Sequence, residues 1–174
     1  MLSSLQEYGV RCLLQLARRP GGGPLTAREI AQAEGLSTDY VEKILSHARE
    51  YGLVTSVRGV HGGFLLAKPA EQITLKETFY ALGGPLYTEQ FCERFTGHRD
   101  TCVHTGNCGI RPLWSFLTKE LDRIMAQTSL RDLLQQEQAV AVQLAQRWDV
   151  LATVKAETAV SSRQQATMER RKNS

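Results

Sequence analysis

The sequence predicts a mostly α-helical fold: a winged helix-turn-helix with a two-stranded wing, followed by a long dimerisation helix, in a homodimer. Three observations carry this prediction. Short amphipathic segments opened by capping signals fill the N-terminal part of the chain. Two β-type segments then flank a glycine-rich tip, and a long apolar stripe lies further along. Elements in this order match a helix-turn-helix with its wing.

Capping signals divide the N-terminal part into three helices. Apolar residues at helical spacing across residues 2–19 predict the first helix, which the following Pro-Gly-Gly-Gly-Pro ends. Thr26 and Glu29 form a capping box for the second helix. A turn at Gly35 precedes the third helix, which Ser37 caps, so that this helix can project its exposed face into a major groove. Its predicted inner face is Val41, Ile44, Leu45 and Ala48.

The wing and the long helix follow. Residues 53–57 and 64–67 have β-character and flank the glycine-rich tip. A capping box at Thr74 opens a fourth helix, and Pro112 suits the first position of the long helix. A capping box at Ser129 is expected to open a last helix. The apolar stripe that predicts dimerisation through the long helix is Leu113, Leu117, Leu121 and Ile124, widened by Trp114, Phe116 and Met125.

We therefore expect four parts along the chain. Residues 1–84 form the winged helix-turn-helix DNA-binding domain, whose first helix also packs at the dimer, and residues 85–110 form a cysteine-rich loop that binds the cofactor. Residues 111–153 form the dimerisation helix and a C-terminal helix. Residues 154–174 are polar and basic with few apolar anchors, which predicts a disordered tail.

Bulk composition fits one globular domain, or one small domain with a helical extension. The 174 residues are 42% hydrophobic and 22% charged, and the net charge of +3 is compatible with nucleic acid without requiring it. No stretch approaches the roughly 18 apolar residues of a membrane span. Arg11, Arg18 and Arg19 interrupt any signal-peptide pattern. We therefore expect a cytoplasmic protein without a membrane partner. Structural disulfides are rare in the cytoplasm.

The exposed face of the third helix and the wing supply candidate DNA contacts. Hydroxyl groups and a tyrosine can bind phosphates or base edges, and a glutamate can accept a hydrogen bond from cytosine N4. An arginine on a glycine-rich tip can enter a narrow minor groove. The alternative is a solvated helix face with an ordinary hairpin, which the order of the elements disfavours. The predicted DNA-binding residues are Ser37, Thr38, Tyr40, Glu42, Lys43, Arg58, Gly59 and His61.

Three cysteines lie close together ahead of the long helix and could converge on one metal centre. We call Cys92, Cys102 and Cys108 the loop cysteines. Iron–sulfur clusters favour thiolate ligands, whereas the loop cysteines with either His98 or His104 would also suit tetrahedral zinc. A fourth cysteine, Cys12, falls in the first helix beside its apolar stripe, where a reduced cysteine acts as a small core residue.

Three segments carry a resemblance to a known family: Ser-Thr-Asp-Tyr-Val-Glu-Lys-Ile-Leu at 37–45, Gly-Leu-Val at 52–54, and Ser-Val-Arg-Gly-Val-His-Gly-Gly-Phe-Leu-Leu-Ala at 56–67. They resemble the Rrf2 family of bacterial regulators, and the likeness covers about residues 1–135. The resemblance implies a homodimer on a palindromic DNA operator. It also implies that Tyr40, Glu42 and Lys43 face bases or phosphates, with Arg58 in the minor groove.

The resemblance further implies an iron–sulfur cluster, because cluster-carrying members use three cysteines just before the long helix. The loop cysteines match that arrangement, although the gap between the first two is longer than usual. IscR-like members supply a histidine three residues after the last cysteine, where this chain has Arg111. NsrR-like members use an N-terminal carboxylate of the other subunit, a position that Glu7 occupies. Glu7, supplied in trans, is therefore the favoured fourth ligand, with His98 and His104 as alternatives.

The expected function is an iron–sulfur-dependent DNA-binding transcriptional regulator. We expect a repressor that holds a [2Fe–2S] or [4Fe–4S] cluster and responds to cluster status, redox state or nitric oxide. A winged-helix regulator with zinc or redox-active thiols in place of the cluster is the first alternative, and a cluster carrier is the second. The sequence shows no paired acid–base carboxylates, phosphate loop or nucleophile motif, so we expect no enzymatic activity.

Overall fold

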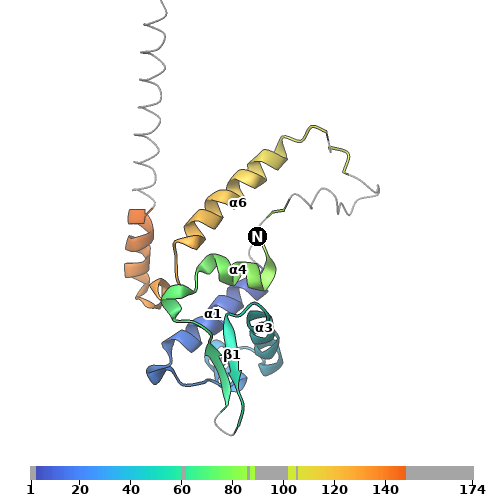
Figure 1. Cartoon of the computed structure of the whole chain (residues 1–174). Helices are drawn as coiled ribbons and strands as arrows, with labels where there is room; N and C mark the ends of the chain where they lie inside the picture. Colours follow the sequence, from blue (N-terminus) through green and yellow to red (C-terminus); the bar gives the residue numbers. More distant parts are fainter. Residues whose placement is uncertain (1–2, 60–61, 86, 89–101, 105, 148–174) are drawn as a thin grey trace, which may run out of the picture. The chain divides into compact units, whose positions relative to one another are not determined.

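The computed structural model describes residues 3–59, 62–85, 87–88, 102–104 and 106–147. The chain forms two compact units, Met1–Leu134 and Gln135–Ser174. In the second unit, residues 137–147 are helical. No helix in the described residues is long and apolar enough to cross a membrane. The main elements of the first unit are α1 (Ser4–Arg18), α2 (Ala27–Glu34), α3 (Thr38–Glu50), β1 (Val54–Val57), β2 (Gly63–Leu66), α4 (Leu75–Gly83) and α6 (Ile110–Ala126) (Figure 1).

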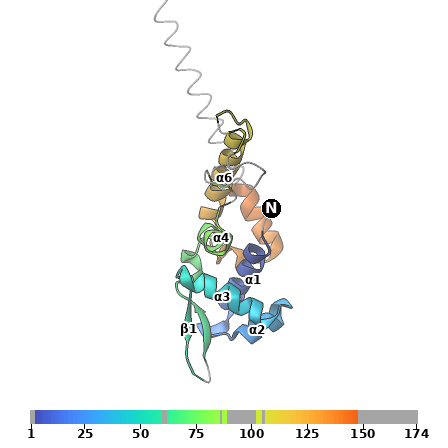
Figure 2. The same ribbon diagram turned by 90° about the vertical axis from the view of Figure 1, so that its right-hand side faces the viewer.

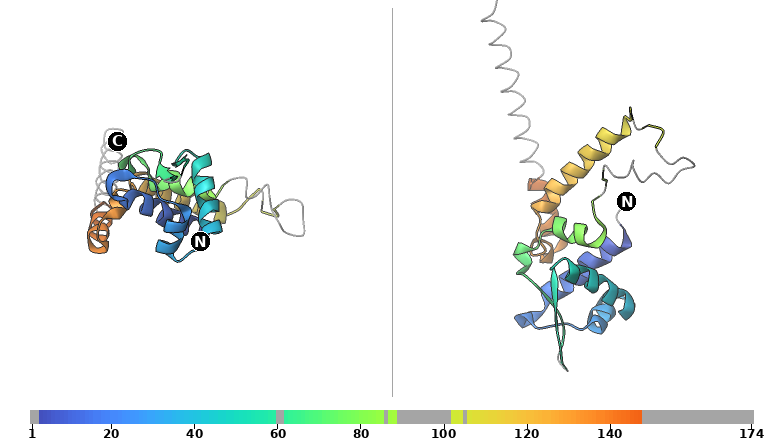
Figure 3. Two further views of the ribbon diagram at one scale, coloured as in Figure 1. Left: turned by 90° about the horizontal axis from the view of Figure 1, so that it is seen from below. Right: turned by 45° about the vertical axis from the view of Figure 1, so that its right-hand side comes forward.

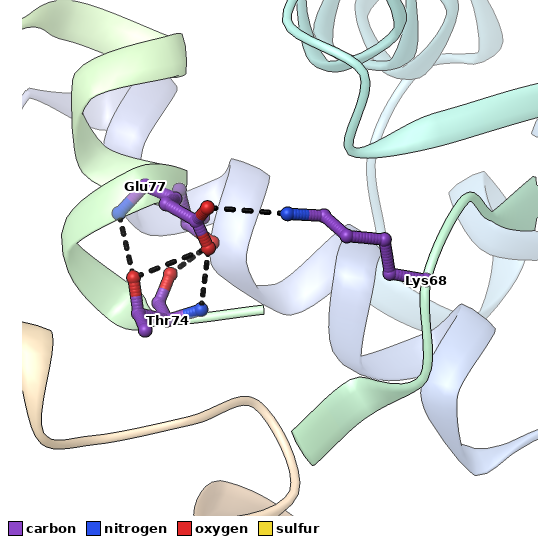
Figure 4. A network of polar contacts seen from close by, with 4 residues as sticks. Lys68, Thr74 and Glu77 are labelled. Carbon is purple, nitrogen blue, oxygen red and sulfur yellow. Dashed lines mark hydrogen bonds and ion pairs between the residues drawn. The ribbon is translucent and has the colours of Figure 1, made fainter. Parts of the chain in front are cut away.

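Side-chain caps begin α2, α3 and α4, as the sequence predicts. The Thr26 hydroxyl accepts from the Glu29 amide at 3.2 Å, and the Glu29 carboxylate accepts from the Thr26 amide at 2.8 Å. The same reciprocal bonds join Thr74 and Glu77 at the start of α4, where Lys68 also pairs with Glu77 at 3.1 Å (Figure 4). Each cap satisfies amides that have no partner within the helix. The predicted N-termini of α2 and α4 are therefore confirmed.

The helices α1 to α4 enclose one apolar core. The predicted inner face of α3 is confirmed, because all four of its residues are fully buried. Gly9 of α1 crosses α4 so closely that a β-carbon there would lie 2.1 Å from Cδ1 of Leu82. Gly35, at φ 67°, ends α2 in the left-handed conformation and makes the short turn into α3 possible. The predicted helix-turn-helix is thus present (Figure 2).

The wing is a two-stranded antiparallel sheet in which Val54 pairs with Leu66 and Val57 pairs with Gly63. A further bridge, absent from the sequence prediction, joins Leu25 to Phe64 through backbone bonds of 3.0 and 2.8 Å. A β-carbon on Gly63 would lie 2.4 Å from the Leu25 carbonyl oxygen, so glycine is needed for this approach. The bridge fixes β2, close to the tip of the wing, to the segment that precedes α2.

The long helix α6 differs in detail from its prediction. It begins at Ile110 with Gly109 as its cap, so Pro112 is its third residue and not its first. Proline is accepted there because the first amides of a helix have no intrahelical acceptor. At the other end the Leu75 amide donates to the Thr128 carbonyl at 2.7 Å. This end of α6 is therefore attached to the start of α4, from which the helix extends away (Figures 1 and 3).

The prediction that Ser129 opens the last helix is wrong. Ser129 and Asp132 do form the reciprocal cap, at 2.9 and 3.2 Å, but it encloses a 3₁₀ turn, Asp132–Leu134. The reason is tertiary: Leu130 is fully buried, and its amide donates to the Ile73 carbonyl at 2.9 Å. The last described helix starts at residue 137 instead. The rest of the helix predicted to reach residue 153, and the predicted tail at 154–174, lie outside the described residues.

Candidate DNA interface and cofactor site

The N-terminal half of α3 presents the predicted DNA-binding side chains. Ser37, Glu42 and Lys43 are exposed, whereas Thr38 is half-buried. The Ser37 hydroxyl also accepts the Tyr40 amide at 3.3 Å, so it caps the helix as well as facing solvent. Exposed donors and acceptors at the start of a helix that follows a tight turn can approach base edges and phosphates.

Tyr40 has a structural role that the sequence does not reveal. Its ring is half-buried against the core and meets the ring of Tyr8 edge-on, with centroids 6.1 Å apart and an interplanar angle of 81°. The guanidinium of Arg11 lies 5.9 Å from the centroid of the Tyr8 ring. Tyr40 therefore joins the start of α3 to α1, and only part of its side chain is available to DNA.

The arginine predicted at the wing tip is exposed to solvent. Arg58 and Gly59 are exposed, and His61 lies outside the described residues. Gly62 donates its amide to the Gly59 carbonyl at 2.9 Å, and a β-carbon on Gly62 would lie 2.3 Å from the Val57 carbonyl oxygen. Glycine at this position is what allows so tight a tip, and the tip displays Arg58.

The structure describes part of the predicted cofactor site. Cys102 and Cys108 are half-buried and His104 is exposed, whereas Cys92 and His98 lie outside the described residues. In the part of the chain that is described, no group of three or more histidine, cysteine or acidic side chains stands ready to hold a metal ion. Cys108 lies two residues before the first residue of α6.

Glu7, the predicted ligand in trans, is accessible on α1. Its carboxylate bonds to Arg11 at 2.8 Å, and about half of each side chain is exposed, 53% and 52% respectively. Its neighbour Gln6 is buried and donates from Nε2 to the carbonyls of Phe79 and Gly84, at 3.4 and 3.1 Å. The start of α1 is thereby fixed to the end of α4, just before the cysteine loop. Sequence analysis did not find Gln6 or Arg11 as parts of this region.

The predicted stripe on α6 lies open to solvent. Along this helix the exposed fractions of the large apolar side chains range from 36% for Leu117 to 59% for Ile110. Contiguous exposed apolar surface of this kind marks an interaction face. Ile124 and Met125 are half-buried instead. The exposed members are Ile110, Leu113, Trp114, Phe116, Leu117 and Leu121.

Cys12 contrasts with the described loop cysteines. Its side chain is fully buried in α1, as predicted for a core residue. Burial, assisted by the nearby charge of Glu34, raises the pKa of the Cys12 thiol to about 12. The thiol is therefore neutral at physiological pH and unsuited to metal binding.

A helix-turn-helix with a wing, an exposed recognition face and an arginine at the wing tip defines a winged-helix DNA-binding transcriptional regulator. The chain belongs to the Rrf2 family, whose model, described as an iron-dependent transcriptional regulator, matches residues 2–136. The family prediction made from the recognition helix and the wing motif is therefore confirmed.

Similar proteins carry the names of transcriptional regulators. IscR of Photorhabdus laumondii is 30% identical over 81% of this chain and 83% of its own length. The protein rrf2 of Nitratidesulfovibrio vulgaris is 32% identical over 76% of this chain and 86% of its own. CymR of Bacillus subtilis is 30% identical over 76% and 88%. Relatives of this kind support a DNA-binding transcriptional regulator.

Solved structures show the same fold. CymR of Bacillus subtilis, described as the global cysteine regulator, matches with a TM-score of 0.62 at 28% identity, over 77% of this chain and 95% of its own. IscR of T. potens matches with a TM-score of 0.59 at 28% identity, over 77% and 85%. The predicted winged-helix fold is therefore confirmed.

Proposed function

We propose that this regulator is a cytoplasmic homodimer that binds a palindromic operator as a repressor and depends on an iron–sulfur cluster. The observation that carries the proposal is the position of Cys102 and Cys108 directly ahead of α6, whose apolar face is exposed. A cofactor held at the start of a dimer helix can influence how the two DNA-binding domains are arranged. Cysteines elsewhere in the fold would have no such influence.

The exposed face of α6 supports the proposed dimer. Burying large apolar side chains contributes about 25 cal/mol for each Å² removed from water. A two-fold axis brings the same face of both copies together, so each residue contributes twice. Six such residues along one helix, from Ile110 to Leu121, favour pairing over exposure to solvent. Two DNA-binding domains related by this axis suit two half-sites of a palindrome.

The residues fit a cluster by the chemistry of their donors. Thiolates are the preferred ligands of iron–sulfur clusters, and the loop cysteines supply three of them. Glu7 of the other protomer is the proposed fourth ligand, since its carboxylate is exposed and is held by an exposed ion pair with Arg11, which contributes little stability. His98 and His104 remain the alternatives. When bound, the cluster would supply a redox- and nitric-oxide-sensitive centre.

DNA binding is assigned to the exposed α3 face and the wing tip. Lys43 and Arg58 would contact phosphates or the minor groove, and Glu42 would accept from a base edge. Ser37, Thr38 and Tyr40 would contact the backbone near the start of α3, and Gly59 and His61 would shape the tip. A dimer that covers an operator blocks access to it, which is the basis for proposing repression.

A second candidate keeps DNA binding but replaces the cluster with zinc or with redox-active thiols. The similarity to CymR supports it, because CymR is described as a cysteine regulator and an oxidised form of the Staphylococcus aureus protein has been solved with a TM-score of 0.61 at 25% identity. Cys102 and Cys108 would then act as thiols and not as iron ligands.

Anaerobic purification tests the two candidates. The cluster proposal predicts a coloured protein with iron and acid-labile sulfide, whereas zinc or thiols give a colourless one. Cys108→Ala should abolish the colour, and Glu7→Ala should lower cluster retention by about 10- to 100-fold, as losses around metal sites do. Cys12→Ala is the matched control, because Cys12 is buried away from the site. A colourless wild-type protein, or equal cluster loss in all three variants, would contradict the proposal.

Selection from a random-sequence duplex library then tests DNA binding by the metal-loaded and metal-free forms. A palindromic consensus with two half-sites is the expected result. Arg58→Ala should reduce affinity for the selected duplex by about 1–3 kcal/mol. Failure to select any sequence in either form would contradict the assignment of α3 and the wing.

A further inference from the structure

A compact polar cluster joins α4 to α6. The Tyr80 hydroxyl donates to Oδ2 of Asp122 at 2.6 Å, and Nζ of Lys76 lies 3.0 Å from the same oxygen. The Lys76 ammonium also lies 5.2 Å from the centroid of the Tyr80 ring. The Asp122 side chain is 18% exposed, so its charge is largely shielded from solvent. We call these three residues the α4–α6 joint.

The two helices that meet at this joint belong to different functional parts. On one side, α4 packs into the DNA-binding core, where Ala81 and Leu82 are buried and Leu82 contacts Gly9 of α1. On the other side, α6 carries the exposed apolar face of the proposed dimer. The angle between α4 and α6 therefore sets where each DNA-binding core lies relative to the dimer face.

The attachment has two points along α6. Backbone bonds hold its C-terminal end, from the Leu75 amide to the Thr128 carbonyl at 2.7 Å and from the Leu130 amide to the Ile73 carbonyl at 2.9 Å. The joint at Asp122 lies four residues before Ala126, the last residue of α6, which is about 6 Å along the helix at 1.5 Å for each residue. One attachment point would act as a pivot, and the second point fixes the angle about it.

A small change of this angle has a large effect at the far end. The 17 residues of α6 span about 25 Å. Turning a helix of that length by about 10° displaces its far end by about 4 Å, which is comparable to the rise of about 3.4 Å between successive base pairs.

We propose that the α4–α6 joint selects the spacing between the two half-sites of the operator. This inference rests on the proposed function as a dimeric DNA-binding protein. Asp122 is the central positioning residue, since its carboxylate accepts from both Tyr80 and Lys76. If the joint served only to stabilise the fold, weakening it would lower affinity for operators of every spacing by the same factor.

The test compares operators that differ only in spacing. Full-length wild-type protein, Asp122→Asn, Tyr80→Phe and Lys76→Met are titrated on the library-selected duplex and on duplexes with one base pair added to or removed from the centre. Lys68→Met is the matched control. Lys68 also pairs with a carboxylate, at 3.1 Å, and its side chain is 39% exposed, like that of Lys76. Its partner, however, is Glu77 of α4, so this ion pair lies within the DNA-binding domain and does not involve α6.

The expected result is a change in the ratio of affinities between spacings. Wild type should prefer its selected spacing. In the joint variants the ratio of affinities between the selected and the altered spacing should fall by about tenfold, which is the discrimination that one mismatched base pair typically brings. Lys68→Met should keep the wild-type ratio. Since the ratio is measured within each variant, partial unfolding cancels from it. Tyr80→Phe retains the bulk of the ring and serves as the second variant if Asp122→Asn does not fold.

Two outcomes would overturn the inference, and they are distinguishable. If wild type selects a palindrome and the joint variants keep its spacing ratio, the joint is structural only and the proposed function stands. If wild type selects no operator or remains a monomer, the proposed function fails and the inference fails with it.

Discussion

The helices α3 and α6 have the same amphipathic pattern but opposite environments. Of its 13 residues α3 buries four, and every large apolar residue of its inner face lies in the core. Among the described residues, α6 buries none of its 17 and exposes six large apolar side chains. The apolar face of α3 is therefore buried within the chain, whereas the apolar face of α6 is exposed to solvent. The DNA-binding core is complete in one copy, and the apolar face of α6, the proposed dimer helix, is not.

The cysteines show the same difference between the two regions. Cys12 belongs to the self-contained core and has no exposed surface, whereas Cys102 and Cys108 precede α6 in the chain and are half-buried. A thiol inside the core is stabilised in its neutral form. Thiols near an incomplete surface stay accessible to metals and oxidants. The three predictions below test this contrast between the core and the dimer helix, from the largest expected effect to the smallest.

The largest effect is expected in thiol reactivity. At about pH 8 the raised pKa of Cys12, about 12 against an ordinary 9.0, lowers its thiolate population by about 1000-fold. Metal-free protein treated with iodoacetamide should therefore be alkylated at Cys102 and Cys108 long before Cys12, as peptide mapping by mass spectrometry would show. Unfolding in urea is the control and should make the rates similar. Alkylation of folded Cys12 at the rate of Cys108 would contradict its placement in the core.

A pair of truncations separates folding from association. Ile44→Ala removes fully buried methyl groups from α3 and should lower the free energy of unfolding by about 2–5 kcal/mol, measured by urea denaturation. Leu113→Ala, on α6, removes a side chain that is 52% exposed in one copy. Because both protomers of the proposed dimer lose this side chain, the substitution should weaken the dimer by about 2–3 kcal/mol. This is an increase of about 30- to 200-fold in the dissociation constant, which sedimentation would measure.

The contrast between these two variants is the informative result. Ile44→Ala should leave the dimer dissociation constant unchanged once folded protein is compared, and Leu113→Ala should leave the unfolding of the separated monomer unchanged. Lys119→Ala on α6, which removes an exposed polar side chain, is the control for the helix itself. If Leu113→Ala left association unchanged, the exposed face of α6 would not be the dimer face.

Sequence predicted the parts of the structure that local interactions determine. The caps at Thr26, Ser37 and Thr74 involve residues three positions apart, and the buried face of α3 follows from helical spacing alone. Ser129 shows the limit of this logic. Its cap is locally correct, but the burial of Leu130 and its bond to Ile73 decide that a 3₁₀ turn follows.

The candidate site was less predictable because its contacts join distant segments. The Tyr8–Tyr40 ring contact and the bond from Tyr80 to Asp122 connect residues on different helices, and no spacing rule relates them. The exposure of Arg58 could be predicted, since a glycine-rich tip leaves few neighbours. The fourth ligand of the loop cysteines is proposed to come from a second protomer, which no contact within one chain can test, so it stays a prediction.

The smallest effect concerns a cap that is complete within one copy. Glu77 accepts from the Thr74 amide and pairs with Lys68, which lowers the pKa of its carboxyl below the usual 4.5. Because the folded value lies below the unfolded one, ionised Glu77 stabilises the fold above about pH 4.5 and loses this contribution as the pH falls through the folded value. Glu77→Gln should therefore be less stable than wild type near neutrality and indistinguishable from it in strong acid, as urea midpoints would show.

The control for this prediction is Glu71→Gln, which removes an exposed carboxylate in the neighbouring turn. The difference should be the same in a Leu113→Ala background, because the cap forms within one copy, at the start of α4, and does not depend on a second copy. A difference that appeared only in the dimer would show that the core is less self-contained than its burial indicates.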